Sequence, residues 1–402
     1  MCVLFAYEAP ADSLIVKLST AFSSNDALEI HILFHELISN AYKNHYASGN
    51  LWQNYLTHFI LSNENFFSLA CERKSPPEGS LKDVAVHDFE GLKRLFGLHN
   101  EHIQYISDFQ NTGRENTHIC EISKAIAECT SAEKIYDIVT NFYRRHGIGK
   151  LAFHRAFRFD GQELLPVEHV GNMRLSDIVG YDAQKAELTA NTEAFVSGRP
   201  ANNVLLYGDG GTGKSTSVKA LLNEYADRGL RVIEIYKHQF RDILKLTEML
   251  RDRNYKFILF IDDLSFEEGE VEYKYLKAVI EGGIETRPDN ILIYATSNRR
   301  HIVREVWKDR DDMEHKGDIH RSDTVEEKLS LASRFGIAIN YSSPDRKMYH
   351  EIVKSLAESS GLAVNEELLA GADRWEIRHG GKTGRAARQY IDYLLGREAL
   401  SE

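Results

Sequence analysis

Residues 202–216 read NNVLLYGDGGTGKST, and this stretch decides the fold of the second half of the chain. A short apolar run leads into a glycine-rich segment that fits the pattern G-x-x-x-x-G-K-[ST], with Gly208 first and Ser215 last. The apolar run predicts a buried strand, and the glycines predict a tight turn after it. From Lys214 onward the sequence predicts a helix that ends at Gly229.

The glycine-rich segment has the chemistry of a phosphate-binding loop. Its glycines allow backbone N–H groups to turn inward around a phosphate, and the following helix adds its positive end. We expect Lys214 to reach the β- and γ-phosphates of a nucleotide, and the Ser215 hydroxyl to coordinate Mg²⁺. The residues expected to contact ATP are Gly208, Asp209, Gly210, Gly211, Thr212, Gly213, Lys214, Ser215 and Thr216.

A second apolar run, FILFIDD at 257–263, ends in two adjacent aspartates. Buried carboxylates are costly unless they are paired or bind a metal. A strand of a parallel sheet would deliver Asp262 to the carboxyl edge, where ligands bind in such folds. We therefore expect Asp262 and Ser215 to hold the same magnesium ion.

Other short, β-branched runs follow at residues 231–236, 290–298 and 337–342, with helical stretches between them. Fully buried strands of a parallel sheet have this composition. Because parallel crossovers are right-handed, the pattern predicts a three-layer α/β domain, which we place at residues 176–343. Residues 344–402 read as helices.

The first part of the chain has a different pattern, because apolar residues recur at helical spacing through residues 13–147. We expect residues 1–149 to form a mainly helical domain with a core of its own. Its last helix is predicted to begin with a capping box of Thr130 and Glu133 and to stop at Gly147.

Residues 150–175 alternate apolar and polar residues around Asp160 and Gly161. This alternation predicts a β-hairpin, which we interpret as a small connector between the two domains.

Composition limits the kinds of partner and location. The net charge of -11 argues against bulk electrostatic binding to nucleic acid or anionic membrane, although local basic patches remain open. The four cysteines show no CxxC spacing, which fits a reducing cytosol. No apolar run approaches about 18 residues, so we expect no membrane span and a cytoplasmic protein.

Residues 175–396 resemble the AAA+ ATPases, and motifs in the family's order carry the resemblance. GDGGTGKS and FILFIDD look like the two Walker motifs. DIVGYDAQKAEL at 177–188 is similar to the segment that lines the adenine pocket, with Val179 and Gly180. The sequence around these motifs is similar to the bacterial AAA+ family named domain of unknown function 815, and so is the N-terminal helical part.

Three further motifs belong to the resemblance: ATSN at 295–298, SRFG at 333–336 and TGRAARQYIDYLL at 383–395. They look like sensor 1, the arginine-finger box and the sensor 2 helix of a C-terminal helical lid. The resemblance implies that Asn298 is the sensor 1 residue, although it could also cap a turn. It implies that Arg334 is a finger supplied to a neighbouring subunit, although it could also be a surface arginine.

Arg385 and Arg388 are both candidates for the sensor 2 residue. We favour Arg385, because taking it as the first-turn residue puts the apolar residues that follow on one buried face of the helix. The resemblance further implies an ATP·Mg²⁺ site between subunits of a homo-oligomer, with a protein or nucleic-acid client that the sequence does not name. Residues 299–328 are long and charged, and we interpret them as a nucleotide-sensitive loop.

Asp263 departs from the family, in which most members have a glutamate that orients the attacking water. Aspartate is shorter by one methylene, and misplacing the water by about 1 Å can cost about 10²-fold in rate. We therefore expect slow ATP hydrolysis, with Asp263 as the catalytic carboxylate that orients the attacking water. Asp263 could instead only cap the next helix, and the protein could be a non-enzymatic assembly switch.

Overall fold

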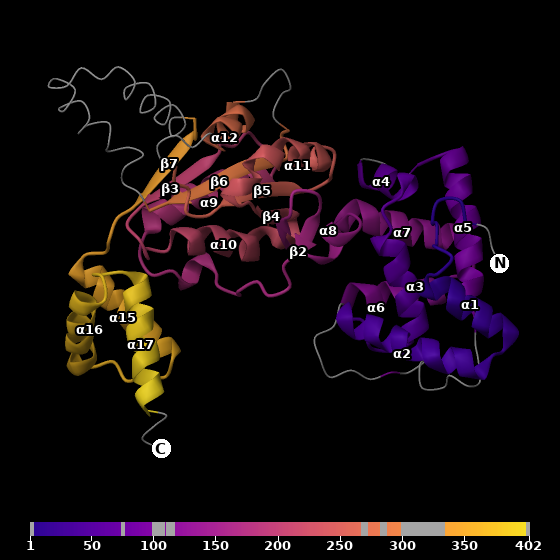
Figure 1. Cartoon of the computed structure of the whole chain (residues 1–402), viewed down its shortest axis with the longest axis horizontal. Helices are drawn as coiled ribbons and strands as arrows, with labels where there is room; N and C mark the ends of the chain where they lie inside the picture. The colour runs from indigo at the N-terminus through magenta and orange to yellow at the C-terminus, as the bar shows by residue number, and fades with distance from the viewer. Residues whose placement is uncertain are drawn as a thin grey trace. The chain divides into compact units, whose positions relative to one another are not determined.

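The computed structural model of the chain describes residues 4–73, 77–98, 109, 117–266, 272–281, 288–298 and 334–398. The chain divides into two compact units, Met1–Phe153 and His154–Glu402. Figure 1 shows the helical first unit in indigo and purple and the second unit from magenta to yellow. The predicted loop at 299–328 and the acidic residues Glu267, Glu268 and Glu270 lie outside the described residues.

The first unit is mainly helical, as the sequence predicted. Its apolar helix faces enclose one core, in which Leu37, Leu56 and Phe89 are fully buried. The described helices of this unit are α1 (Leu14–Ser24), α2 (Ala27–Lys43), α3 (Leu51–Ser62), α4 (Phe66–Arg73), α5 (Ser80–Phe96), α6 (Thr117–Ala127), α7 (Ala132–His146) and α8 (Lys150–Phe153).

The N-terminus of α7 differs by one residue from the predicted capping box. Ser131 is the N-cap in extended backbone, and its side chain accepts a hydrogen bond from the Lys134 N–H. The prediction of Thr130 as the cap is therefore wrong, because Thr130 lies one residue too early to face the first helical N–H groups. The predicted end of the helix at Gly147 is confirmed, and this glycine has a φ of 72°.

The second unit is built on one seven-stranded sheet with the strand order β2-β1-β4-β5-β6-β3-β7. All neighbouring strands are parallel except β1 and β2. The carboxyl ends of β3, β5 and β6 therefore meet at one edge of the sheet. The strands are β1 (Ala156–Phe159), β2 (Leu164–Pro166), β3 (Val204–Gly208), β4 (Leu230–Glu234), β5 (Lys256–Ile261), β6 (Ile291–Ser297) and β7 (Ile337–Tyr341).

The predicted β-hairpin forms, but it is part of this sheet and not a separate connector. β1 pairs in parallel with β4, with Ala156 opposite Val232, so the hairpin extends the sheet at one edge. The residues before it, Lys150–Phe153, form α8 and belong to the first unit. Local alternation indicated the two strands, but it holds no information about a partner strand that lies far along the chain.

Helices cover both faces of the sheet, which confirms the three-layer α/β fold. Leu188 of α9 and Val218 of α10 pack against alternate strand residues such as Leu206. The intervening residue Leu205 is also buried, and Figure 1 shows α11 and α12 on the side of the strands opposite α10. The helices of this part are η2 (Leu175–Asp177), α9 (Asp182–Val196), α10 (Lys214–Tyr225), η3 (Ala226–Arg228), η4 (Lys237–Asp242), α11 (Ile243–Leu250) and α12 (Glu272–Glu281).

The C-terminal helices α15 (Arg346–Ser359), α16 (Glu366–Arg378) and α17 (Gly384–Glu398) form a small bundle with its own core, drawn in yellow in Figure 1. Tyr349 and Ile391 are fully buried between them. The bundle is the helical lid that the sequence predicted. Within the described part of the chain, no helix combines the length and apolar character needed to cross a membrane.

Candidate nucleotide site

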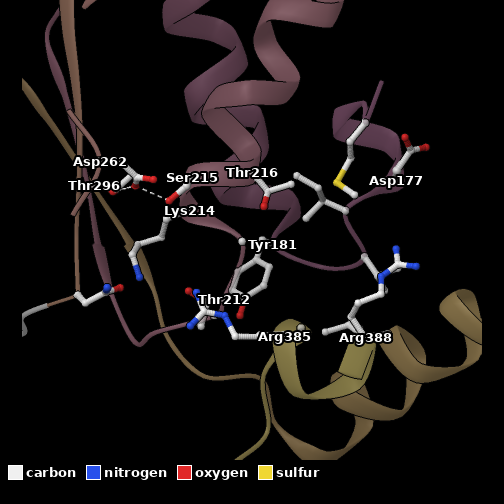
Figure 2. Close-up of a pocket in the computed structure, with 18 of the residues that line it drawn as sticks. Asp177, Tyr181, Thr212, Lys214, Ser215, Thr216, Asp262, Thr296, Arg385 and Arg388 are labelled. Carbon is white, nitrogen blue, oxygen red and sulfur yellow. Dashed lines mark hydrogen bonds between the residues drawn. The ribbon is translucent and has the colours of Figure 1, made fainter. Parts of the chain in front are cut away.

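A cleft of about 560 Å³ opens at the carboxyl edge of the sheet, a size typical of small-molecule sites. Its walls come from the glycine-rich turn between β3 and α10, the ends of β5 and β6, the segment before α9, and the lid helices α15 and α17. Figure 2 shows side chains from these parts pointing into one space. The P-loop, the acidic strand end and the lid are thus brought together.

Close backbone contacts explain two glycines of the turn. A Cβ on Gly208 would lie 2.2 Å from the carbonyl oxygen of Tyr341 in β7, and the φ of Gly208 is 131°. A Cβ on Gly211 would lie 3.0 Å from the Cβ of Arg385 in the lid, and its φ is 74°. Larger residues would therefore push the turn away from the sheet at one position and from the lid at the other.

Lys214 is the first residue of α10 and is almost completely buried. Its Nζ donates hydrogen bonds to the carbonyl oxygens of Gly208 (3.1 Å) and Asp209 (2.6 Å). Burial lowers the pKa of Lys214, while the nearby carboxylates, Asp209 first among them, act in the opposite direction. The ammonium is therefore held at the mouth of the turn by neutral acceptors, where an anionic ligand would relieve its desolvation.

Ser215 and Asp262 meet at the end of β5, as the sequence predicted. The Ser215 Oγ donates to Asp262 Oδ1 at 2.6 Å, and the Thr296 Oγ1 donates to the same oxygen at 2.6 Å. Figure 2 shows these three side chains together. Among the described residues, no group of three His, Cys, Asp or Glu side chains could hold a metal ion. A hydroxyl beside one carboxylate instead fits Mg²⁺, which is usually held by one or two protein oxygens together with phosphates and water.

Asp263 follows directly and lines the same cleft. Its Oδ1 accepts a hydrogen bond from Asn298 Nδ2 at 3.0 Å, and its N–H donates to Thr296 Oγ1 at 3.0 Å. The φ of Asp263 is 53°, a left-handed conformation that costs free energy in a non-glycine residue. The structure thus pairs Asp263 with Asn298, the residue that the resemblance assigns to sensor 1.

Arg334 lies at the other edge of the sheet, just before β7, and is exposed. β7 runs parallel to β3, so Arg334 is separated from the phosphate-binding edge by the length of the strand, roughly 17 Å for five residues. It does not line the cleft. Within one chain, Arg334 therefore lies before the amino-terminal end of β7, outside the cleft lining.

The lid brings both candidate arginines to the cleft, because Arg385 and Arg388 line it from α17. The backbone N–H of Arg385 also donates to the carbonyl oxygen of Gly211 at 3.3 Å. Figure 2 shows Arg385 beside Thr212 of the turn and Arg388 farther along the helix. Both arginines therefore remain candidates for the sensor 2 role, and Arg385 lies nearer to the phosphate-binding turn.

The segment before α9 contributes differently from the prediction. Val179 lines the cleft, but Gly180 does not. Gly180 has a φ of 75°, and a Cβ there would lie 2.3 Å from the Met348 side chain, so this glycine lets the chain pass close to α15. Gly208, Asp209 and Gly210 also stay outside the lining, and the Asp209 carboxylate accepts bonds from the Ser343 N–H and hydroxyl at 2.8 Å.

Tyr181 and Thr296 line the cleft, although the sequence analysis assigned them no role. The Tyr181 ring stacks on Tyr341 at 4.9 Å, and its hydroxyl donates to the Ser342 carbonyl at 2.8 Å. Burial, followed by the charge of Asp209, raises the pKa of Tyr181 to about 12. Strand alternation could have indicated Thr296, because it lies two residues before Asn298.

Comparisons with known proteins place the chain in a family. Residues 152–398 match the family described as "Protein of unknown function (DUF815)". The replication factor C large subunit of Staphylothermus marinus is 35% identical over 69 residues, which are 17% of this chain and 16% of that protein.

Among solved structures, the Thermotoga maritima RuvB Holliday junction branch migration motor is 20% identical, with a TM-score of 0.36. The match covers 54% of this chain and 62% of the RuvB chain, and a RuvB variant gives a TM-score of 0.38. The chain spans less than two thirds of the length of either relative.

The family match covers more than half of the chain, and the fold agrees with it independently. A parallel sheet carries a phosphate-binding loop after β3 and an acidic pair after β5, and a helical lid follows β7. The chain therefore belongs to the family described as protein of unknown function, DUF815, and its architecture is the one expected of an AAA+ P-loop domain.

Proposed function

We propose that this protein binds ATP with Mg²⁺ in the cleft, hydrolyses it slowly at subunit interfaces, and uses the turnover to remodel or load a macromolecular partner. The observation that carries the proposal is the pairing of Asp263 with Asn298 beside the Ser215–Asp262 pair. One pair suits a magnesium ion and the other suits an attacking water, and they lie on neighbouring strand ends.

Each residue has a proposed role in the reaction of ATP and water to ADP and phosphate. Lys214 binds the β- and γ-phosphates, and Ser215 and Asp262 hold Mg²⁺, which neutralises charge on those phosphates. Asp263, oriented by Asn298, positions the water and accepts its proton as the oxygen attacks the γ-phosphorus.

Arg334 is proposed to complete the site of a neighbouring subunit. Its location at the amino-terminal end of β7 supports this role, because it does not line the cleft of its own chain. A finger supplied in trans contributes on the order of 10³–10⁵ in rate, so a monomer should be nearly inactive. The functional form is accordingly a homo-oligomer.

A specific observation keeps a second function open. The Asp263 carboxylate is one methylene shorter than glutamate, and it is hydrogen-bonded to Asn298 in this structure. An acid held this way with short reach could leave the water poorly placed. The protein would then be an ATP-dependent assembly switch with negligible turnover.

The partner and the location also remain proposals. The first unit has its own core and is suited to act as an adaptor for a protein or nucleic-acid client. The cytoplasmic location expected from the cysteine spacing stays a prediction.

Replacing Asp263 by asparagine distinguishes the two functions. We expect Asp263→Asn to abolish ATP hydrolysis while ATP·Mg²⁺ binding, measured by titration calorimetry, stays within about twofold, because Asp262 still holds the metal. Asp289→Asn is the matched control, since Asp289 is an exposed aspartate at the opposite end of the strands, and it should leave both properties unchanged. Hydrolysis by Asp263→Asn at the parent rate would remove the catalytic role of Asp263.

A further inference from the structure

Thr296 makes three hydrogen bonds to three consecutive residues at the end of β5. Its Oγ1 donates to Asp262 Oδ1 at 2.6 Å and accepts from the Asp263 N–H at 3.0 Å. Its carbonyl oxygen accepts from the Leu264 N–H at 2.6 Å. The side chain is only 2% exposed, so water cannot easily replace these partners.

The hydroxyl acts both as donor and as acceptor. A threonine has one O–H proton, which goes to the carboxylate of Asp262, and its oxygen accepts one hydrogen bond, from the Asp263 N–H. One buried oxygen therefore connects the residue proposed to hold the metal with the residue proposed to position the water.

The same contact helps to hold an uncommon backbone conformation. Asp263 has a φ of 53°, and the bond from its N–H to Thr296 fixes the turn that presents its carboxylate to Asn298. Without the Thr296 hydroxyl, Asp262 loses a buried donor and the Asp263 N–H loses its acceptor.

We infer that Thr296 is a positioning residue that sets the metal-binding carboxylate and the water-positioning carboxylate in a single geometry. The inference rests on the proposed function, because it concerns how that site is assembled. Thr296 acts through Asp262 and Asp263, and partners of this outer kind typically change metal affinity by about 10- to 100-fold when they are removed.

The test replaces Thr296 by valine, which keeps the shape and removes the hydroxyl, and by serine, which restores it. The affinity for a non-hydrolysable ATP analogue is measured once in the presence of Mg²⁺ and once in the presence of EDTA. Mg²⁺ should increase the affinity of Thr296→Val for the analogue about 10-fold less, or less still, than it increases the affinity of the wild type. The affinity measured in EDTA should be the same in both proteins. Thr296→Ser should recover most of the loss.

Hydrolysis gives a second readout in the same variants. Thr296→Val should lower kcat more than it changes KM in saturating Mg²⁺, because the phosphate contacts of Lys214 are untouched.

Thr192→Val is the matched control for simple loss of a buried threonine hydroxyl. Thr192 is fully buried in α9 and bonds the Tyr294 hydroxyl at 2.8 Å, outside the cleft lining. It should lower the melting temperature without changing the Mg²⁺ dependence. If Thr296→Val fails to fold, Thr296→Ala is measured instead, with the same loss expected.

Equal Mg²⁺ dependence in the wild type and the folded Thr296 variants would overturn the inference. So would a loss in Thr296→Val that serine does not recover. If the wild type itself binds no analogue, the proposed function fails, and this inference fails with it.

Discussion

Replacing Gly208 by alanine should destabilise the second unit, whereas the same replacement at Gly210 should not. A Cβ on Gly208 would lie 2.2 Å from the Tyr341 carbonyl oxygen, and contacts under 3.0 Å are essentially never seen. The strand β7 or the turn must therefore shift by about 0.8 Å, the difference between these distances. The same carbonyl accepts the Asp209 N–H at 3.1 Å, so a shift of this size would weaken or break that bond.

The expected cost combines three contributions. Loss of the backbone hydrogen bond costs about 1 kcal/mol. A side chain at a φ of 131° costs about 1–3 kcal/mol. Overpacking against a strand backbone costs about 1–3 kcal/mol. The unfolding free energy should fall by about 3–7 kcal/mol, a large part of the 5–15 kcal/mol typical of a domain.

The assay is urea unfolding followed by tryptophan fluorescence in a variant that keeps Trp375 of the lid and has Trp52 and Trp307 replaced by phenylalanine, together with far-UV circular dichroism. Gly210 is the matched control in the same loop, because its Cβ would meet nothing within 4 Å and its φ lies outside the left-handed region. Gly210→Ala should change the unfolding free energy by less than about 1 kcal/mol. Equal stability of the two variants would show that β7 does not approach the turn as described.

Three further variants test the lid. Arg385→Ala should weaken ATP binding about tenfold or more through loss of a charge-assisted contact, and more than Arg388→Ala; the reverse order would transfer the role to Arg388. Burial raises the pKa of Asp373, but the hydrogen bonds and charges of His350 and Arg346 together outweigh it and hold this pKa below its ordinary value of 3.8. Its stabilisation is thus present above pH 3.8 and lost as the pH falls through the lower folded pKa. Asp373→Asn should cost about 1 kcal/mol in denaturation at pH 7, a difference that narrows below about pH 4; a constant difference would contradict this.

Local patterns were sufficient for the parts of the site that are contiguous in sequence. The sequence was sufficient to assign residues 208–215 and Asp262 to the nucleotide site. Buried parallel strands are continuous apolar runs, and the residues that follow them are the ones that bind ligands. The contact of Ser215 with Asp262 follows from two such runs ending at one edge. The hydrogen bond between Asp263 and Asn298 depends on the same geometry, because β5 and β6 are neighbouring strands.

Contacts between distant segments could not be predicted in this way. The stacking of Tyr181 on Tyr341 and the close approach of Gly180 to Met348 join residues about 160 positions apart, and no local periodicity encodes them. The pairing of β1 with β4 has the same character. Thr296 is a different case, because the sequence could predict its position on the strand. Only the structure shows that its hydroxyl is hydrogen-bonded to both Asp262 and Asp263.

If a complete ATPase site forms between two subunits, mixing two inactive variants should restore part of the activity. Lys214→Ala and Arg334→Ala should each be nearly inactive and folded. In an equal mixture, about one quarter of the interfaces would join an intact Lys214 to an intact Arg334.

ATP hydrolysis in that mixture should accordingly recover to about a quarter of the wild-type rate, and the wild-type rate per subunit should rise with protein concentration. A mixture as inactive as its two folded components, together with a wild-type rate independent of concentration, would contradict the shared site.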